Sequence, residues 1–142
     1  PVLNRKHEKQ VQGFCRELIQ RDFISSAHDC SEGGLAIAVA ESCFSPGCQT
    51  LGATLTLEST LRNDTLLFGE TQSRIVISFP EERINEIEDL AMAFPVDFSL
   101  IGKVGGSHFT IMVNGNEIIK QEIDVLKEIW ENSLGNYAGQ TT

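Results

Sequence analysis

Basic residues are scarce in this sequence and they do not cluster. Its 142 residues include 11 Lys and Arg against 20 Asp and Glu, so the formal net charge is −9. Nucleic acids and anionic membrane surfaces bind proteins through grouped basic side chains. The densest basic segment is only NRKHEK, at residues 4–9. The composition therefore predicts no nucleic-acid partner and no membrane partner.

Long apolar runs and a signal peptide are missing as well. No hydrophobic segment approaches the length needed to span a bilayer, and the chain does not open on a secretion signal. We therefore expect a cytoplasmic protein. The chain also begins with Pro1 rather than Met, and we expect it to be one domain, residues 1–142, of a larger polypeptide.

The four cysteines do not form a metal-binding pattern. Cys15, Cys30, Cys43 and Cys48 lack the two closely spaced Cys/His pairs of a structural zinc site. The sequence therefore predicts free thiols in a reducing compartment, and no metal site.

Helical and strand patterns alternate along the chain. Hydrophobic periodicity predicts helices at residues 4–21, 32–43, 59–69, 81–94 and 124–134. Strands are expected at residues 22–28, 49–58, 73–80 and 98–104, and in a hairpin at 108–122 whose Asn114-Gly115 pair suits a tight turn. In the last helix, we expect Val125, Leu126, Ile129 and Trp130 to share an apolar face. This order predicts an α/β or α+β domain of two or three layers.

The segment SSAHDCSEGGLAIAVAE, at residues 25–41, carries the first candidate site. A strand that turns through glycines into a helix exposes unpaired amides at the positive end of the helix dipole, which suits an anion. Gly33 and Gly34 would let a phosphate approach the backbone, while His28 and Asp29 stand at the strand end.

A purely structural interpretation of this segment stays open. Ser31 is placed to cap the helix that follows, and Asp29 would accept hydrogen bonds from the backbone amides of the turn. The segment is neither a P-loop nor a dinucleotide-binding fingerprint.

The segment FGETQSR, at residues 68–74, is the second candidate site. Glu70, Thr71, Gln72 and Arg74 stand between two apolar segments. Glu and Gln can hold hydroxyl or amide groups of a small ligand, and Arg74 can pair with a carboxylate or phosphate. The alternative is a solvated loop with a weak Glu70–Arg74 ion pair. No catalytic set of residues is evident in the chain.

Three segments in order carry a family resemblance. SSAHDCSEGGLAIAVAES, LLFGETQSRIVISF and the later IGKVGG resemble the C-terminal domain of phosphoribosylformylglycinamidine synthase, the synthetase of purine biosynthesis. The resemblance covers nearly the whole chain. It implies a mixed sheet covered by helices, as in the C-terminal domain of aminoimidazole ribonucleotide synthetase.

The resemblance also implies a function. Enzymes of this family convert formylglycinamide ribonucleotide, ATP and glutamine-derived ammonia to formylglycinamidine ribonucleotide, ADP and phosphate. ATP and magnesium would be held mainly by upstream domains, and a glutaminase and a small accessory subunit would be partners. The catalytic residues would lie outside this chain, so we expect the isolated domain to be inactive and to complete a composite or auxiliary nucleotide site.

Within this resemblance, nine residues become ligand-binding candidates: His28, Asp29, Ser31, Gly33, Gly34, Glu70, Thr71, Gln72 and Arg74. Related enzymes with the same type of domain, selenophosphate synthetase and a hydrogenase maturation protein, remain alternatives, although FGETQSR favours the purine enzyme. A non-catalytic ligand-binding module is a further alternative.

Overall fold

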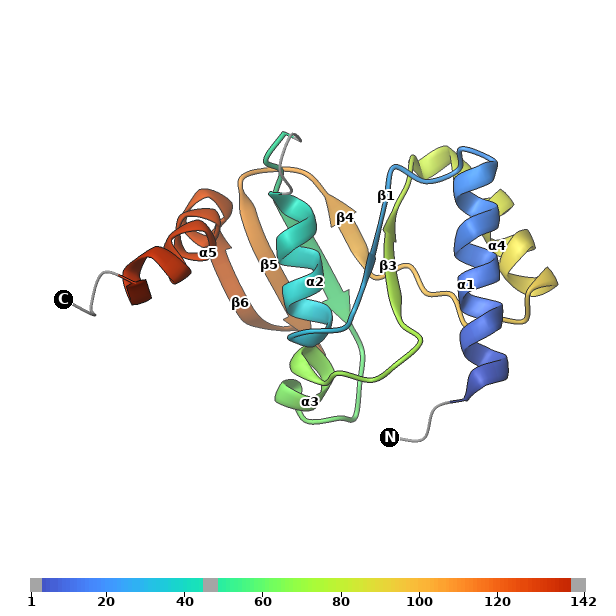
Figure 1. Cartoon of the computed structure of the whole chain (residues 1–142), viewed down its shortest axis with the longest axis horizontal. Coiled ribbons are helices and arrows are strands. Elements are labelled where there is room, and N and C mark those ends of the chain that lie inside the picture. The colour runs from blue at the N-terminus through green and yellow to red at the C-terminus, as the bar shows by residue number, and fades with distance from the viewer. Residues whose placement is uncertain (1–3, 45–48, 139–142) are drawn as a thin grey trace. The chain divides into compact units, whose positions relative to one another are not determined.

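The computed structural model describes residues 4–44 and 49–138, with side chains to residue 133. The chain forms two compact units, the first of residues 1–39 and 61–100 and the second of residues 40–60 and 101–142. Figure 1 shows the elements of both. Cys48 lies outside the described residues.

The first unit combines helices with a two-stranded ribbon. Its elements are α1 (Arg5–Gln20), β1 (Ser26–Asp29), the start of α2 (Gly34–Cys43), α3 (Asn63–Phe68), β3 (Ile75–Ser78), the short 3₁₀ helix η1 (Glu81–Arg83) and α4 (Ile84–Ala93). β1 and β3 pair antiparallel, with His28 opposite Val76 and Asp29 opposite Ile75. This pairing brings the two candidate segments of the sequence to the same end of the ribbon.

The core of the first unit lies between α1 and α4, which run side by side in Figure 1. The periodic apolar residues of the two helices form it: Phe14, Leu18, Ile87, Leu90 and Ala91. Leu18 and Ile87 are completely buried. The rings of Phe14 and Phe94 pack against each other, with their centroids 6.1 Å apart. The side chain of Asn4 caps α1 by accepting from the amide of His7.

The second unit is built on a mixed four-stranded sheet. Its strands are β2 (Ala53–Leu57), β4 (Gly102–Val104), β5 (His108–Val113) and β6 (Asn116–Glu122), in the spatial order β4-β2-β5-β6. β2 runs parallel to β5, and the other pairs are antiparallel. The mixed sheet and its helices confirm the predicted fold class.

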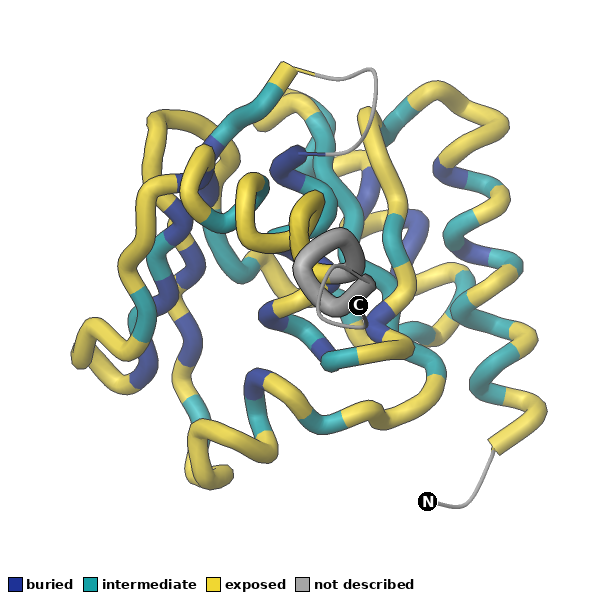
Figure 2. The backbone as a smooth tube through the Cα atoms, turned by 60° about the vertical axis from the view of Figure 1, so that its left-hand side comes forward, coloured by how far each residue is buried: buried dark blue, intermediate teal, exposed yellow. Residues whose placement is uncertain are grey.

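Alternation along β2 and the turn after β5 account for the sheet. Every second residue of β2 is buried, as a strand with one covered face requires. Figure 2 marks the buried, intermediate and exposed parts of the backbone. Asn114 and Gly115 both have positive φ, 49° and 76°, which is the geometry of the type I′ turn predicted for this pair.

The strand expected over residues 98–104 is wrong in extent, because only the three residues of β4 form it. The predicted last helix forms as α5 (Ile123–Ala138), and on its apolar face Ile129 is 63% accessible and Trp130 47%. Trp130 packs its ring against Phe44 and donates from Nε1 to Glu41 at 3.1 Å.

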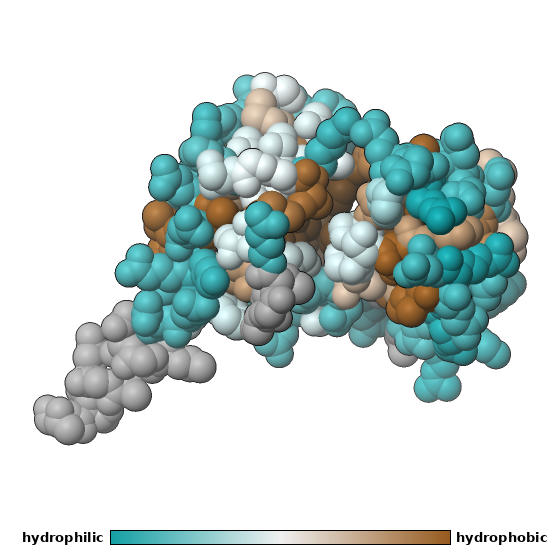
Figure 3. Space-filling model, turned by 90° about the horizontal axis from the view of Figure 1, so that it is seen from above, coloured by the Kyte–Doolittle hydropathy of each residue, from teal (hydrophilic) through white to brown (hydrophobic). Residues whose placement is uncertain are grey.

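The face that Figure 3 shows carries mainly hydrophilic side chains, with several apolar patches among them. Across residues 4–44 and 49–138, no helix is both long and apolar enough to cross a membrane. Cys15, Cys30 and Cys43 are free thiols, and burial raises the pKa of the Cys43 thiol to about 11.

The core predicts a clear contrast within α4. Ile87→Ala removes a completely buried side chain and should lower the free energy of unfolding by about 2–5 kcal/mol. Met92→Ala, on the same helix with 77% of the residue exposed, should change it by less than about 0.5 kcal/mol. Denaturant titration of both variants checks this, and equal losses would contradict the assignment of the core.

Candidate functional site

The two candidate segments meet through one hydrogen bond. The amide of Gly33, immediately before α2, donates to Oε1 of Glu70 at 2.9 Å. Gly34 is buried against the backbone of residues 68 and 69, where a Cβ would lie 2.8 Å from the carbonyl carbon of Phe68. Gly33 and Gly34 both have φ near +70°, a conformation that favours glycine. The glycine pair therefore permits the turn to lie directly on the loop.

Glu70 caps the start of α2, a role that the sequence analysis assigned to Ser31 and Asp29. α2 begins at Gly34, so the residue in the capping position is Gly33 and not Ser31. Among the described residues, no amide donates to the Asp29 carboxylate, and Asp29 is exposed. A glutamate that accepts from the residue before a helix resembles half of a capping box, and its charge is favoured at the positive end of the helix.

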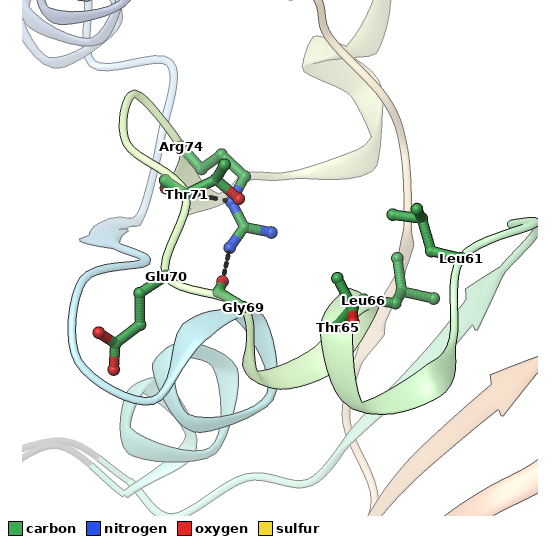
Figure 4. A pocket seen from close by; sticks show the side chains of 7 residues that line it. All are labelled: Leu61, Thr65, Leu66, Gly69, Glu70, Thr71 and Arg74. Atoms are coloured by element: carbon green, nitrogen blue, oxygen red, sulfur yellow. Dashed lines mark hydrogen bonds between the residues drawn. The ribbon is translucent and has the colours of Figure 1, made fainter. Parts of the chain in front are cut away.

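Hydrogen bonds of Arg74, through its side chain and its backbone, hold both ends of the loop from Gly69 to Arg74. Its guanidinium donates from Nη2 to the carbonyl of Gly69 and from Nε to that of Thr71 at 3.4 Å, as Figure 4 shows. The carbonyl of Arg74 in turn accepts from the amide of Cys30 at 3.0 Å. Burial raises the pKa of the Cys30 thiol, and the nearby charge of Arg74 partly opposes that rise.

The middle of the loop is held by helix α1. Ser73 has φ of +63°, a left-handed conformation that costs a non-glycine residue about 1–3 kcal/mol. Its hydroxyl donates to Oε2 of Glu8, and Gln12 donates to Oε1 of the same carboxylate at 2.6 Å. These two hydrogen bonds, the one from Ser73 foremost, lower the pKa of Glu8. Sequence reasoning missed Glu8 and Ser73, since nothing in the local pattern pairs residues 65 positions apart.

An open pocket of about 350 Å³ lies beside this loop. Leu61, Thr65 and Leu66, from α3 and the segment before it, form one wall, and Gly69, Glu70, Thr71 and Arg74 form the other. In Figure 4 the Glu70 carboxylate points away from the pocket, toward the start of α2. Within the described part of the chain, Nη1 of Arg74 has no hydrogen-bond partner, so it remains available to an anionic group.

The remaining ligand-binding candidates do not line this pocket as Arg74 does, or are exposed to solvent. His28 is half-buried, with Nδ1 2.7 Å from the carbonyl oxygen of Asp29. Ser31, Thr71 and Gln72 are exposed. Among the described residues, no three His, Cys, Asp or Glu side chains come close enough together to hold a metal ion. Within residues 4–44 and 49–138, the site thus offers one guanidinium, backbone amides and hydroxyls, but no arrangement of carboxylates that fits magnesium.

These features define a class of protein: a mixed α/β domain in which a polar loop closes over the start of a helix. The family model described as AIR synthase related protein, C-terminal domain, matches residues 1–114. The chain belongs to this family.

Curated relatives narrow the comparison. The chain is 40% identical over 134 residues to phosphoribosylformylglycinamidine synthase subunit PurL of Moorella thermoacetica, and 37% identical to that of Alkaliphilus metalliredigens. Each match covers 94% of this chain but only 18% of the relative. The chain therefore spans less than a fifth of the length of these relatives.

Solved structures agree on the fold. Phosphoribosylformylglycinamidine synthase II of Thermotoga maritima superposes with a TM-score of 0.77 at 19% identity, covering 88% of this chain and 22% of that one. A structure of T. maritima PurL complexed with ATP gives a TM-score of 0.73 at 18% identity, covering 83% and 21%.

The Glu70–Gly33 contact predicts opposite outcomes for two acidic residues. Glu70→Ala should lower the free energy of unfolding by about 1 kcal/mol, as the loss of a helix cap does. Asp29→Ala, its matched control one element away, should leave stability within about 0.5 kcal/mol. Thermal unfolding of both variants measures the contrast, and a larger loss for Asp29→Ala would restore the capping role to Asp29.

Proposed function

We propose that this chain is a C-terminal-type domain, residues 1–142, of an ATP-dependent synthetase. The synthetase would convert formylglycinamide ribonucleotide and glutamine-derived ammonia to formylglycinamidine ribonucleotide in purine biosynthesis. The observation that carries the proposal is the match to PurL relatives across 94% of the chain at up to 40% identity. The reaction is a carbon–nitrogen ligation, and the enzyme would be cytoplasmic.

The domain would contribute binding rather than chemistry. Arg74 presents a guanidinium N–H toward the pocket, where it can pair with a phosphate or carboxylate. The hydroxyl of Thr71 and the amide of Gln72 are exposed on the same loop and can add hydrogen bonds. Because the Glu70 carboxylate already accepts a hydrogen bond from the Gly33 amide, we assign Glu70 a role in holding the loop rather than in contacting the ligand.

ATP would be bound chiefly by the upstream domains of the same polypeptide, with this domain closing a composite or auxiliary nucleotide site. We assign magnesium to those domains as well, because the described residues offer no group of ligands for it. The solved complex named PurLQS of T. maritima contains more than one component by its name. By analogy, a glutaminase and a small accessory subunit are proposed partners here.

The direct test is ammonia-dependent ATP turnover with formylglycinamide ribonucleotide. Three preparations should be compared: the full-length polypeptide, the polypeptide truncated before Pro1, and the truncated form mixed with this 142-residue chain. We expect truncation to abolish turnover and the added chain to restore it, while the chain alone hydrolyses no ATP.

A variant of the added chain sharpens the test. Arg74→Ala should restore turnover at least about tenfold less well than the native sequence, because it removes the one cation that lines the pocket among the described residues. The exposed Met92→Ala variant is the matched control and should restore turnover fully. Undiminished turnover by the truncated polypeptide would contradict the proposal.

A further inference from the structure

The loop between α3 and β3 depends on a residue that does not line the pocket. The ends of the loop are fixed by backbone contacts, through Arg74 to Gly69 and through the amide of Cys30 to the carbonyl of Arg74. Between them, the side chain of Ser73 reaches out to helix α1 and donates its hydroxyl hydrogen to Glu8. Ser73 is also the residue of this loop with a positive φ, +63°.

Glu8 is itself held in place. Gln12, one turn later in α1, donates to its second carboxylate oxygen at 2.6 Å, so both oxygens are engaged. The helix is fixed just before this point, because Asn4 caps it through the amide of His7. Glu8 also lies in the first turn of α1, where the helix dipole favours a negative charge. The acceptor for Ser73 is therefore well defined in position.

Displacing Ser73 would move the groups that face the pocket. Thr71 precedes it by two residues and Arg74 follows it directly, and the guanidinium of Arg74 takes its orientation from the carbonyls of Gly69 and Thr71. Without the Glu8 contact, the left-handed conformation of Ser73 loses the side-chain bond that accompanies it. The loop backbone is then free to change conformation. The carbonyl of Thr71, which accepts from Arg74 and orients its guanidinium, would move with it.

We propose that Glu8, supported by Gln12, is a positioning residue: through Ser73 it holds the 69–74 loop so that Arg74 and Thr71 face an anionic ligand in the pocket. This inference rests on the proposed function for its kinetic test. Its structural content, that α1 determines the conformation of the loop, stands independently of the reaction.

The first test is a double-mutant cycle in the full-length polypeptide, with ammonia-dependent turnover as the readout. Glu8→Ala and Ser73→Ala should each lower kcat/KM by about tenfold, since small misplacements of binding groups are costly. The double variant should be no worse than either single one, because both remove the same contact. Glu8→Gln, which keeps an acceptor oxygen, should recover most of the activity.

Glu17→Ala is the matched control on the same helix. Its carboxylate pairs with Arg21 and touches neither the loop nor the pocket, so kcat/KM should stay within about twofold of the native value. If the losses of Glu8→Ala and Ser73→Ala multiply, or if Glu8→Ala behaves like Glu17→Ala, the inference is overturned.

A second test separates this inference from the proposed function. In amide NMR spectra of the 142-residue chain, Glu8→Ala and Ser73→Ala should shift the signals of Thr71 and Gln72 alike, and Glu17→Ala should not. If the native polypeptide shows no turnover while these signals shift, the proposed function fails and the positioning role stands. Unshifted loop signals in a folded Glu8→Ala chain would overturn the positioning role whatever the enzyme does.

Discussion

The hydrogen bond from the Gly33 amide to the Glu70 carboxylate is the contact on which the site depends. It joins a turn and a loop that are 37 residues apart, and it places a negative charge at the start of α2. Gly34 makes this possible, because a side chain there would collide with the backbone at Phe68. The turn before α2, which the sequence analysis proposed as a phosphate site, is therefore occupied by the carboxylate of Glu70 from the same chain. The guanidinium of Arg74 lies instead on the pocket side of the loop.

One side of the 69–74 loop thus contacts the neighbouring helices, and the other side lines the pocket. Glu70 and Ser73 face the scaffold, toward α2 and α1, and fix the backbone. Arg74 and Thr71 line the pocket, whose opposite wall is formed by the apolar side chains of Leu61 and Leu66. Side chains that hold the backbone in this way preorganise the groups that line the pocket.

The sequence predicted local structure well wherever one strong local rule acts. The helix α1, the alternation in β2 and the Asn114-Gly115 turn all appear as expected. Predictions that needed a partner from elsewhere were less accurate. Ser31 and Asp29 are reasonable caps by local rules, yet Glu70 takes that role from a distance. Glu8 has no local signal at all.

The central claim is that Glu70 occupies the start of α2, and the amide proton of Gly33 reports on it directly. In NMR spectra of the 142-residue chain, Glu70→Ala removes the acceptor of the Gly33 amide hydrogen. We expect the Gly33 amide signal to shift in this variant and to stay in place in the Asp29→Ala control. A Gly33 amide signal that is unchanged in Glu70→Ala, or that shifts equally in Asp29→Ala, would contradict the account.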